Sequence, residues 1–231
     1  MKRARAQVEA RYARHFLEPH FDAVGEGCTY ERPWTITVQG PGIELGERVH
    51  IASTRDQAVR FAFWPAVHGQ GGIRIGDYSM INPGVRLNAT AGIEIGRNAI
   101  FAANIYVTDC DWHGMYDRVY SRGEHAPVVL RDNVWIGENA IVCKGVTIGE
   151  NSVIGAGSVV VKDIPDNRVA AGNPARVIRE LDPNEKFISR DHVFAEPELY
   201  FGELRRIQEE LMSQNTLRDF LRYILKPTRT D

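Results

Sequence analysis

One short stretch of the chain, VTDCDWHGMYD at residues 107–117, gathers side chains that can carry out proton transfer. His113 is a candidate general base, because a neutral imidazole can take a proton from a hydroxyl or an amine near neutral pH. Asp109 and Asp111 lie close to it in sequence, and carboxylates beside a reactive histidine can orient the ring and stabilise its cation. Trp112 can shield a site from water or offer a flat face to a sugar ring. The stretch therefore predicts the kind of base that acyl transfer requires.

The chain around this stretch repeats with a period of six residues. An aliphatic residue recurs at every sixth position, and the residue four places after it is small or β-branched. The recurring residues are Leu130, Ile136, Val142, Ile148, Ile154 and Val160, and an earlier block has Ile75, Ile81 and Leu87, then Ile95, Phe101 and Val107 after a slip of two. Neither a helix, with a period of about 3.6 residues, nor a simple alternating strand produces this column. Asn133, Asn139 and Asn151 fall at the expected turns, where left-handed backbone conformations are least costly.

A solenoid of triangular cross-section accounts for this period. Each hexapeptide makes one short strand and one corner, three hexapeptides complete a coil, and backbone hydrogen bonds stack the coils around the aliphatic column. Between Val107 and Leu130 the column advances by 23 residues, whereas a multiple of six requires 18 or 24. We therefore expect residues from about 108 to 126 to leave the solenoid as a loop that carries His113.

Residues 133–181 contain the motifs VWIG, GAGSVVVKDIP and AAGNPARVIR. This segment resembles the C-terminal half of the galactoside, maltose and Nod-factor O-acetyltransferases and the related xenobiotic acetyltransferases, which are hexapeptide-repeat acyltransferases. A weaker resemblance covers about residues 60–130. The resemblance implies a mainly β fold, a left-handed parallel β-helix. It further implies acetyl-CoA as the donor, no metal, His113 as the general base, and a homotrimer in which the loop of one subunit reaches the next.

The resemblance also implies binding residues, position by position. Asn82 matches an asparagine of the acceptor site, although Asn82-Pro83-Gly84 is equally a good corner sequence. Thr90 stands where the sugar enzymes carry an acid, which implies a different acceptor. The candidate acceptor-binding residues are Asn82, His68, Asp111 and Trp112. The candidate acetyl-CoA-binding residues are Ala156 and Val161, through backbone groups, and Arg176 and Arg179, near the phosphates.

Changes in composition divide the chain into three parts. Residues 1–20 predict a solvated amphipathic helix, and residues 21–175 the β-helix acyltransferase domain. Residues 176–231 predict a helical extension, with helices that open near prolines at the start of PNEKFISRDH and of PELYFGELRR. An apolar stripe in this extension predicts core packing or a subunit contact. It comprises Leu204, Ile207, Leu211, Leu217, Phe220, Leu221 and Ile224.

Charge and composition exclude several classes of function. The formal net charge of -2 and the pI near 6.4 give no net attraction to nucleic acid or to anionic lipid. No apolar run approaches the roughly 20 residues that a membrane span requires, and we expect a cytoplasmic protein without membrane insertion. Three widely spaced cysteines, Cys28, Cys110 and Cys143, argue against a disulfide framework and a zinc knuckle.

The favoured function is direct transfer of an acetyl group from acetyl-CoA to a hydroxyl of a sugar or glycan precursor. Three alternatives remain open: N-acetylation of an amino sugar, a zinc-dependent carbonic-anhydrase-like enzyme on the same scaffold, and a scaffold without catalysis. The zinc enzyme requires three converging histidines, and the candidates, His50, His68, His113 and His125, show no close spacing. A covalent route through a cysteine requires a paired base as well.

Overall fold

The computed structural model describes residues 2–67, 69–121, 123–182 and 184–198, together with residues 202, 206, 207, 209, 210 and 225. His68, one of the expected acceptor-binding residues, lies outside the described residues. The chain divides into two compact units, Met1–Phe187 and Ile188–Asp231.

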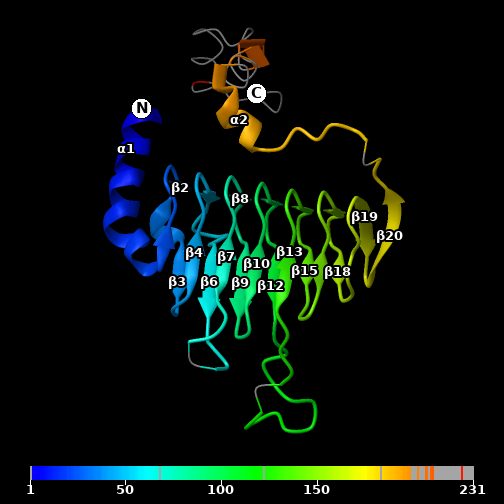
Figure 1. Cartoon of the computed structure of the whole chain (residues 1–231). Coiled ribbons are helices and arrows are strands. Elements are labelled where there is room, and N and C mark those ends of the chain that lie inside the picture. The colour runs from blue at the N-terminus through cyan, green and yellow to red at the C-terminus, as the bar shows by residue number, and fades with distance from the viewer. Residues whose placement is uncertain are drawn as a thin grey trace. The chain divides into compact units, whose positions relative to one another are not determined.

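The first unit is a β-helix in which each coil contributes one parallel strand to each of three sheets (Figure 1). The final strand of one sheet runs antiparallel to its neighbour. Sheet A contains β1 (Ala23–Val24), β4 (Ile43–Leu45), β7 (Ile73–Ile75), β10 (Ile93–Ile95), β13 (Val128–Leu130) and β16 (Thr147–Ile148). Sheet B contains β2 (Thr29–Glu31), β5 (His50–Ala52), β8 (Met80–Ile81), β11 (Ile100–Phe101), β14 (Trp135–Ile136), β17 (Val153–Ile154), β19 (Arg168–Gly172) and β20 (Ala175–Glu180). Sheet C contains β3 (Thr37–Gln39), β6 (Arg60–Phe63), β9 (Arg86–Ala89), β12 (Tyr106–Thr108), β15 (Ile141–Val142) and β18 (Val159–Val160). Parallel strands with a hexapeptide repeat fit the left-handed form of this fold.

The aliphatic column forms the core of the β-helix, as its period predicts. Residues 18 positions apart are stacked in register, for example Leu130 on Ile148 and Val142 on Val160. Every member of both predicted blocks is buried, with at most 2% of its surface exposed. This burial removes apolar surface from water in each coil, so each coil is stabilised by its neighbours.

The turn asparagines adopt the left-handed conformation that the sequence predicts. The φ angles of Asn133, Asn139 and Asn151 are 56°, 58° and 58°. Two of these side chains also form a ladder along the corner, because Asn133 Nδ2 donates to Asn151 Oδ1 at 2.9 Å and Asn151 Nδ2 donates to Asn167 Oδ1 at 3.1 Å. The corners are therefore fixed both by local backbone preference and by contacts between coils.

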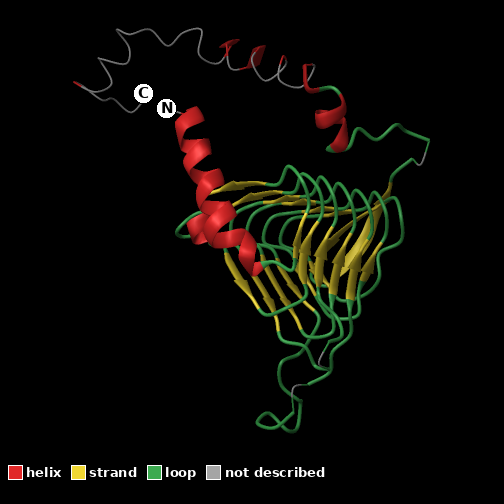
Figure 2. Cartoon of the chain, turned by 60° about the vertical axis from the view of Figure 1, so that its left-hand side comes forward, coloured by secondary structure: helices red, strands yellow, loops and turns green. Residues whose placement is uncertain are grey.

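The N-terminal helix lies beside the first coils (Figure 2). It consists of α1 (Lys2–Tyr12), continued by a π-helical turn, η1 (Ala13–Leu17), and a 3-10 turn, η2 (Glu18–His20). A further 3-10 turn, η3 (Pro33–Thr35), follows β2. Ala13, Leu17 and Phe21 are buried and join the core of the first coils, so the predicted N-terminal helix is part of the packed unit.

The second unit contains one described helix with bounds, α2 (Asp191–Ala195). Residues 184–189, which span the boundary between the two units and which the sequence predicts to be helical, form a turn and irregular backbone. Most of the predicted apolar stripe from 204 to 224 lies outside the described residues, with Ile207 as the exception. In the described part of the chain, no helix combines the length and the apolar character needed to cross a membrane.

Candidate active site

A loop of residues 109–127 leaves the β-helix where the chain passes from sheet C to sheet A, an edge that we call the C–A edge. β12 ends at Thr108 and β13 begins at Val128, so the chain departs where the sequence predicts the interruption. The loop projects away from the sheets (Figure 1). Its two ends are joined by a β-bridge between Cys110 and His125 and by a hydrogen bond from Asp111 N to Glu124 O at 3.0 Å. The two ends of the loop are therefore paired with each other, and we call this paired base the neck of the loop.

Asp109 anchors this neck to the preceding coil. Its buried carboxylate accepts hydrogen bonds from three consecutive backbone N–H groups, of Thr90, Ala91 and Gly92, at 2.6–3.0 Å. Burial raises the pKa of the Asp109 carboxyl above its ordinary value, while the three donors act in the opposite direction. Asp109 thus holds the loop to the C–A edge and does not orient His113, contrary to our expectation.

Asp111 anchors the same neck to the following coil. Lys144, in the corner between β15 and β16, donates to both carboxylate oxygens of Asp111, at 2.7 and 2.8 Å. Its Nζ atom also lies 3.7 Å from Oε2 of Glu124, on the other side of the neck. An acceptor that binds Asp111 would have to share this carboxylate with Lys144. The role of Asp111 in binding the acceptor therefore stays a prediction.

Trp112 is fixed by its own polar groups. Its backbone has a φ of 66°, its N–H donates to Cys110 Sγ at 3.2 Å, and its indole Nε1–H donates to Thr108 Oγ1 at 3.1 Å. Its ring meets that of Trp64, the first residue of an earlier crossing from sheet C to sheet A, two coils before the crossing that forms the loop. The four residues before His113 are thus each held by a different contact.

His113 follows this anchored segment and is itself oriented. Its Nδ1 atom lies 3.0 Å from the backbone carbonyl oxygen of Arg118, and because a carbonyl can only accept, Nδ1 carries the proton in this bond. In the neutral ring the lone pair is then on Nε2, as a general base requires. The arrangement can therefore remove a proton at Nε2, with a backbone carbonyl in the orienting role that the sequence assigned to a carboxylate.

The tip of the loop is apolar and exposed. Met115 is 75% exposed, Tyr116 is fully exposed at 102%, and Tyr120 is 91% exposed. His113 and Arg118 line an open depression of about 710 Å³ next to these residues. Large apolar side chains at such exposure are typical of surfaces that contact another protein.

The other candidate residues lie on two different edges of the β-helix. Asn82 and Ala156 follow strands of sheet B, at the B–C edge, whereas Val161 follows β18 at the C–A edge, where His113 also lies. Asn82 Nδ2 donates to Phe101 O at 2.7 Å, which supports its role as a corner residue. A single chain therefore does not bring Asn82 and Ala156 to the edge that carries the loop.

Arg176 and Arg179 project from the same side of β20, for a reason that the sequence does not reveal. A spacing of three in a regular strand would place them on opposite faces. Val169 and Ala170 are consecutive in β19, but they pair with Arg179 and Val177 of β20. Ile178 is therefore the extra residue of a β-bulge. On β19, Arg176 pairs with Ala171 and Arg179 pairs with Val169. These two partners lie on either side of the buried Ala170, so they share one face of the strand. Both guanidinium groups can therefore face one ligand outside sheet B.

The described residues offer little support for covalent or metal chemistry. Burial raises the pKa of the Cys143 thiol, against the lowering effect of Lys144, and it also raises the pKa of Cys28. A raised pKa leaves less thiolate, the form that acts as a nucleophile. Within the described residues, no group of three or more histidine, cysteine, aspartate or glutamate side chains is placed to hold a metal ion.

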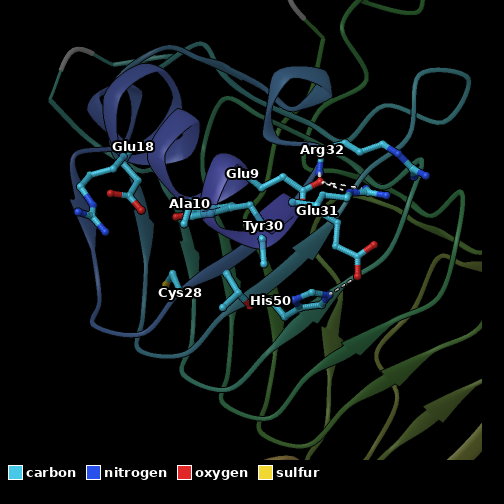
Figure 3. Close-up of a pocket in the computed structure, with 12 residues that line it drawn as sticks. Glu9, Ala10, Glu18, Cys28, Tyr30, Glu31, Arg32 and His50 are labelled. Carbon is cyan, nitrogen blue, oxygen red and sulfur yellow. Dashed lines mark hydrogen bonds and ion pairs between the residues drawn. The ribbon is translucent and has the colours of Figure 1, made fainter. Parts of the chain in front are cut away.

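A separate cavity of about 550 Å³ lies between α1 and β2 (Figure 3). The buried Glu9 occupies one wall, where it accepts two hydrogen bonds from the Arg5 guanidinium and one from the backbone N–H of Arg32, at 2.9–3.0 Å. On the opposite wall, His50 Nδ1 and Thr29 Oγ1 are 2.9 Å apart. Glu9 thus ties α1 to the first coil, and none of the described residues predicted for catalysis or for binding the acceptor or acetyl-CoA lines this cavity.

Comparisons with known proteins agree with this architecture. A family model described as "Bacterial transferase hexapeptide (six repeats)" matches residues 127–162, and one described as "Hexapeptide repeat of succinyl-transferase" matches residues 72–109. A galactoside O-acetyltransferase of Lactococcus lactis is 31% identical over 178 residues, which cover 76% of this chain and 70% of that protein.

Two further relatives match over shorter segments. The galactoside O-acetyltransferase of Escherichia coli K12 is 46% identical over 96 residues, 41% of this chain, and a putative acetyltransferase of Saccharomyces cerevisiae is 44% identical over 110 residues, 47% of this chain. The chain spans about half the length of these two relatives, 47% and 56%.

Among solved structures, a mutant of AntD, an N-acyltransferase from Bacillus cereus, in complex with dTDP and coenzyme A, has a TM-score of 0.59 at 21% identity. The match covers 84% of this chain and 96% of that chain. At this identity the likeness concerns the fold.

Proposed function

The chain belongs to the hexapeptide-repeat acetyltransferases, the group of the galactoside O-acetyltransferases, and on that premise we propose that it transfers an acetyl group from acetyl-CoA to a hydroxyl of a sugar or glycan precursor. The observation that carries this proposal is the geometry of His113. Its Nδ1 is bound to the Arg118 carbonyl, and its loop is anchored to the coils on both sides. A base held in this way can act on an acceptor without rearrangement of the scaffold.

The proposed reaction is a direct transfer in a complex of enzyme, acceptor and acetyl-CoA. His113 Nε2 removes the proton of the acceptor hydroxyl, and the oxygen attacks the thioester carbonyl. A backbone N–H group stabilises the oxyanion of the tetrahedral intermediate. The carbon–sulfur bond then breaks, and the proton on His113 passes to the sulfur of coenzyme A, so that an ester and free coenzyme A result.

We assign each active site to two subunits of a homotrimer. The C–A edge of one chain, with His113 and Val161, would face the B–C edge of the next, with Asn82 and Ala156. This arrangement joins the two half-sites that one chain keeps apart, and cyclic closure suits such a heterologous contact.

Two exposed apolar surfaces support contacts between subunits. The loop tip would pack against a neighbour, which accounts for the exposure of Met115 and Tyr116. The outer face of sheet B adds a second apolar surface, with Ile100, Trp135 and Val153 in one column and Trp135 51% exposed. The subunits are thus expected to bury surfaces that a single chain leaves in water.

The test of the proposed function is an acceptor screen with the purified protein and acetyl-CoA. The panel would contain galactosides, maltose, glucosamine and an acyclic polyol, with thiol release as the rate and mass spectrometry of the product. An alkali-labile acetyl ester would support O-acetylation, whereas an alkali-stable amide on glucosamine would replace it by N-acetylation. Thiol release no faster than that of His113→Ala with every acceptor would contradict acetyl transfer to this class of acceptor.

A further inference from the structure

Trp64 occupies an unexpected position beside the candidate base. It lies directly after β6, at the start of an earlier crossing of the C–A edge, and 44% of its surface is exposed. Its ring centroid lies 5.5 Å from that of Trp112, and the two ring planes are 88° apart. The sequence separates these residues by 48 positions, and stacking of the coils brings them together.

The crossing that contains Trp64 is fixed to the rest of the edge by its backbone. Trp64 N donates to Ala89 O at 2.9 Å, and Ala66 N donates to Thr90 O at 3.0 Å. The N–H of Thr90 in turn donates to Asp109, at the base of the loop. The three successive crossings from sheet C to sheet A are therefore joined by hydrogen bonds. These bonds hold both the crossing that carries Trp64 and the loop that carries Trp112.

The pair forms two apolar walls that meet at nearly a right angle. In an edge-to-face pair, one ring points its edge at the face of the other, so flat faces remain for a ligand. Trp112 cannot turn freely, because its Nε1–H is bound to Thr108 Oγ1. In this corner a saturated ring could place its C–H face on one indole and its rim against the other, and thereby remove apolar surface from water.

This corner lies next to the reacting group. Trp112 immediately precedes His113, and consecutive Cα atoms are about 3.8 Å apart. A ring held on the two indoles would lie beside the residue that precedes the base, so that a hydroxyl at its rim could reach Nε2 of His113.

We propose that Trp64 and Trp112 together bind the acceptor, and that the acceptor is a molecule with a saturated ring, such as a pyranoside, with one apolar face and a hydroxyl at its rim. This inference rests on the proposed acetyl transfer and adds Trp64 as a residue that determines its specificity. It distinguishes ring-shaped acceptors from acyclic alcohols with the same reacting group.

Substitution of Trp64 tests this inference. Trp64→Ala is expected to raise the KM for a pyranoside acceptor about three- to tenfold, the effect of one aromatic contact, and to leave the KM for acetyl-CoA and for sorbitol unchanged. Trp64→Phe, which keeps a flat apolar face, is expected to restore most of the affinity for the pyranoside. Uncoupled hydrolysis of acetyl-CoA serves as a reference that does not involve the acceptor.

Trp34 provides the matched control. It is 48% exposed and forms a similar edge-to-face pair with Tyr12, at 5.7 Å and 84°, in the N-terminal part of the chain. Trp34→Ala should not change the KM for the pyranoside. An unchanged KM in Trp64→Ala, with active wild-type enzyme, would overturn the inference and leave the proposed function intact. An equal rise for pyranoside and sorbitol would overturn it too, because it would show that Trp64 only supports the loop. Failure of the wild type with every acceptor would instead refute the proposed function.

Discussion

Lys144 donates two hydrogen bonds to Asp111, at 2.8 Å to Oδ1 and 2.7 Å to Oδ2, and so joins the loop of His113 to the next coil of the β-helix. The hydrogen bond with Asp111 raises the pKa of Lys144 above its ordinary value of 10.5. The stabilisation by this pair is therefore fully present below pH 10.5 and is lost only as the pH rises through the higher pKa of the folded state. At neutral pH the neck of the loop is clamped.

Lys144→Met should loosen this clamp. The ion pair is partly exposed, so we expect turnover to fall only about two- to fivefold and cleavage of the loop by a protease to become faster. The pH profile between about pH 6 and 9 should keep its shape, since the raised pKa of Lys144 lies above that range. Lys144→Arg, which keeps the charge, is the control and should resemble the wild type. Equal proteolysis and turnover in Lys144→Met and wild type would show that the pair does not position the loop.

Asp109→Asn should destabilise the fold. An amide has one acceptor oxygen in place of two, and its NH₂ group would face backbone donors at Thr90, Ala91 or Gly92. We expect a loss of about 3 kcal/mol in the free energy of unfolding, measured by urea denaturation. Asp117, an exposed loop aspartate that also accepts backbone N–H groups, provides the control, and Asp117→Asn should have little effect. Similar stability of the two variants would argue against Asp109 as an anchor.

The period of six was sufficient to predict the core and the place of the loop, because Leu130 and its equivalents recur every six residues after the break and, apart from one slip of two residues, before it. Contacts between coils could not be predicted in the same way. The partners of Asp109 precede it by 17 to 19 positions, and Trp64 meets Trp112 only because two crossings of unequal length share an edge. The bulge at Ile178 likewise changes which face an arginine occupies, and no residue pattern marks it.

Arg176 and Arg179 are predicted to bind the phosphates of acetyl-CoA. The double variant, with alanine at both positions, should weaken acetyl-CoA binding by about tenfold, since charge-assisted contacts are worth less when exposed. The KM for the acceptor should change little. The wild type should bind 3′-dephospho-CoA less tightly than coenzyme A, and the double variant should lose part of this preference. Arg131→Ala, an exposed arginine at a corner after sheet A, serves as control. If calorimetry shows the same affinity for the double variant and the wild type, this assignment is wrong.

The shared site predicts complementation between inactive subunits. His113→Ala removes the base at the C–A edge, and Ala156→Glu places a negative charge at the B–C edge, where coenzyme A is proposed to bind. Each variant alone should be inactive. Trimers assembled from a mixture should recover part of the activity, because some interfaces combine two intact halves. Light scattering should give the mass of three chains. A monomer with full activity would refute both the trimer and the shared site.

The most direct test of the account is the turnover of His113→Ala with the best acceptor of the screen. Removal of a general base should lower turnover by about 10²–10⁴-fold, while the affinity for acetyl-CoA remains close to that of the wild type. His20→Ala, a histidine exposed in the N-terminal segment, should retain full turnover. Turnover of His113→Ala close to that of the wild type would exclude His113 as the base and contradict the mechanism.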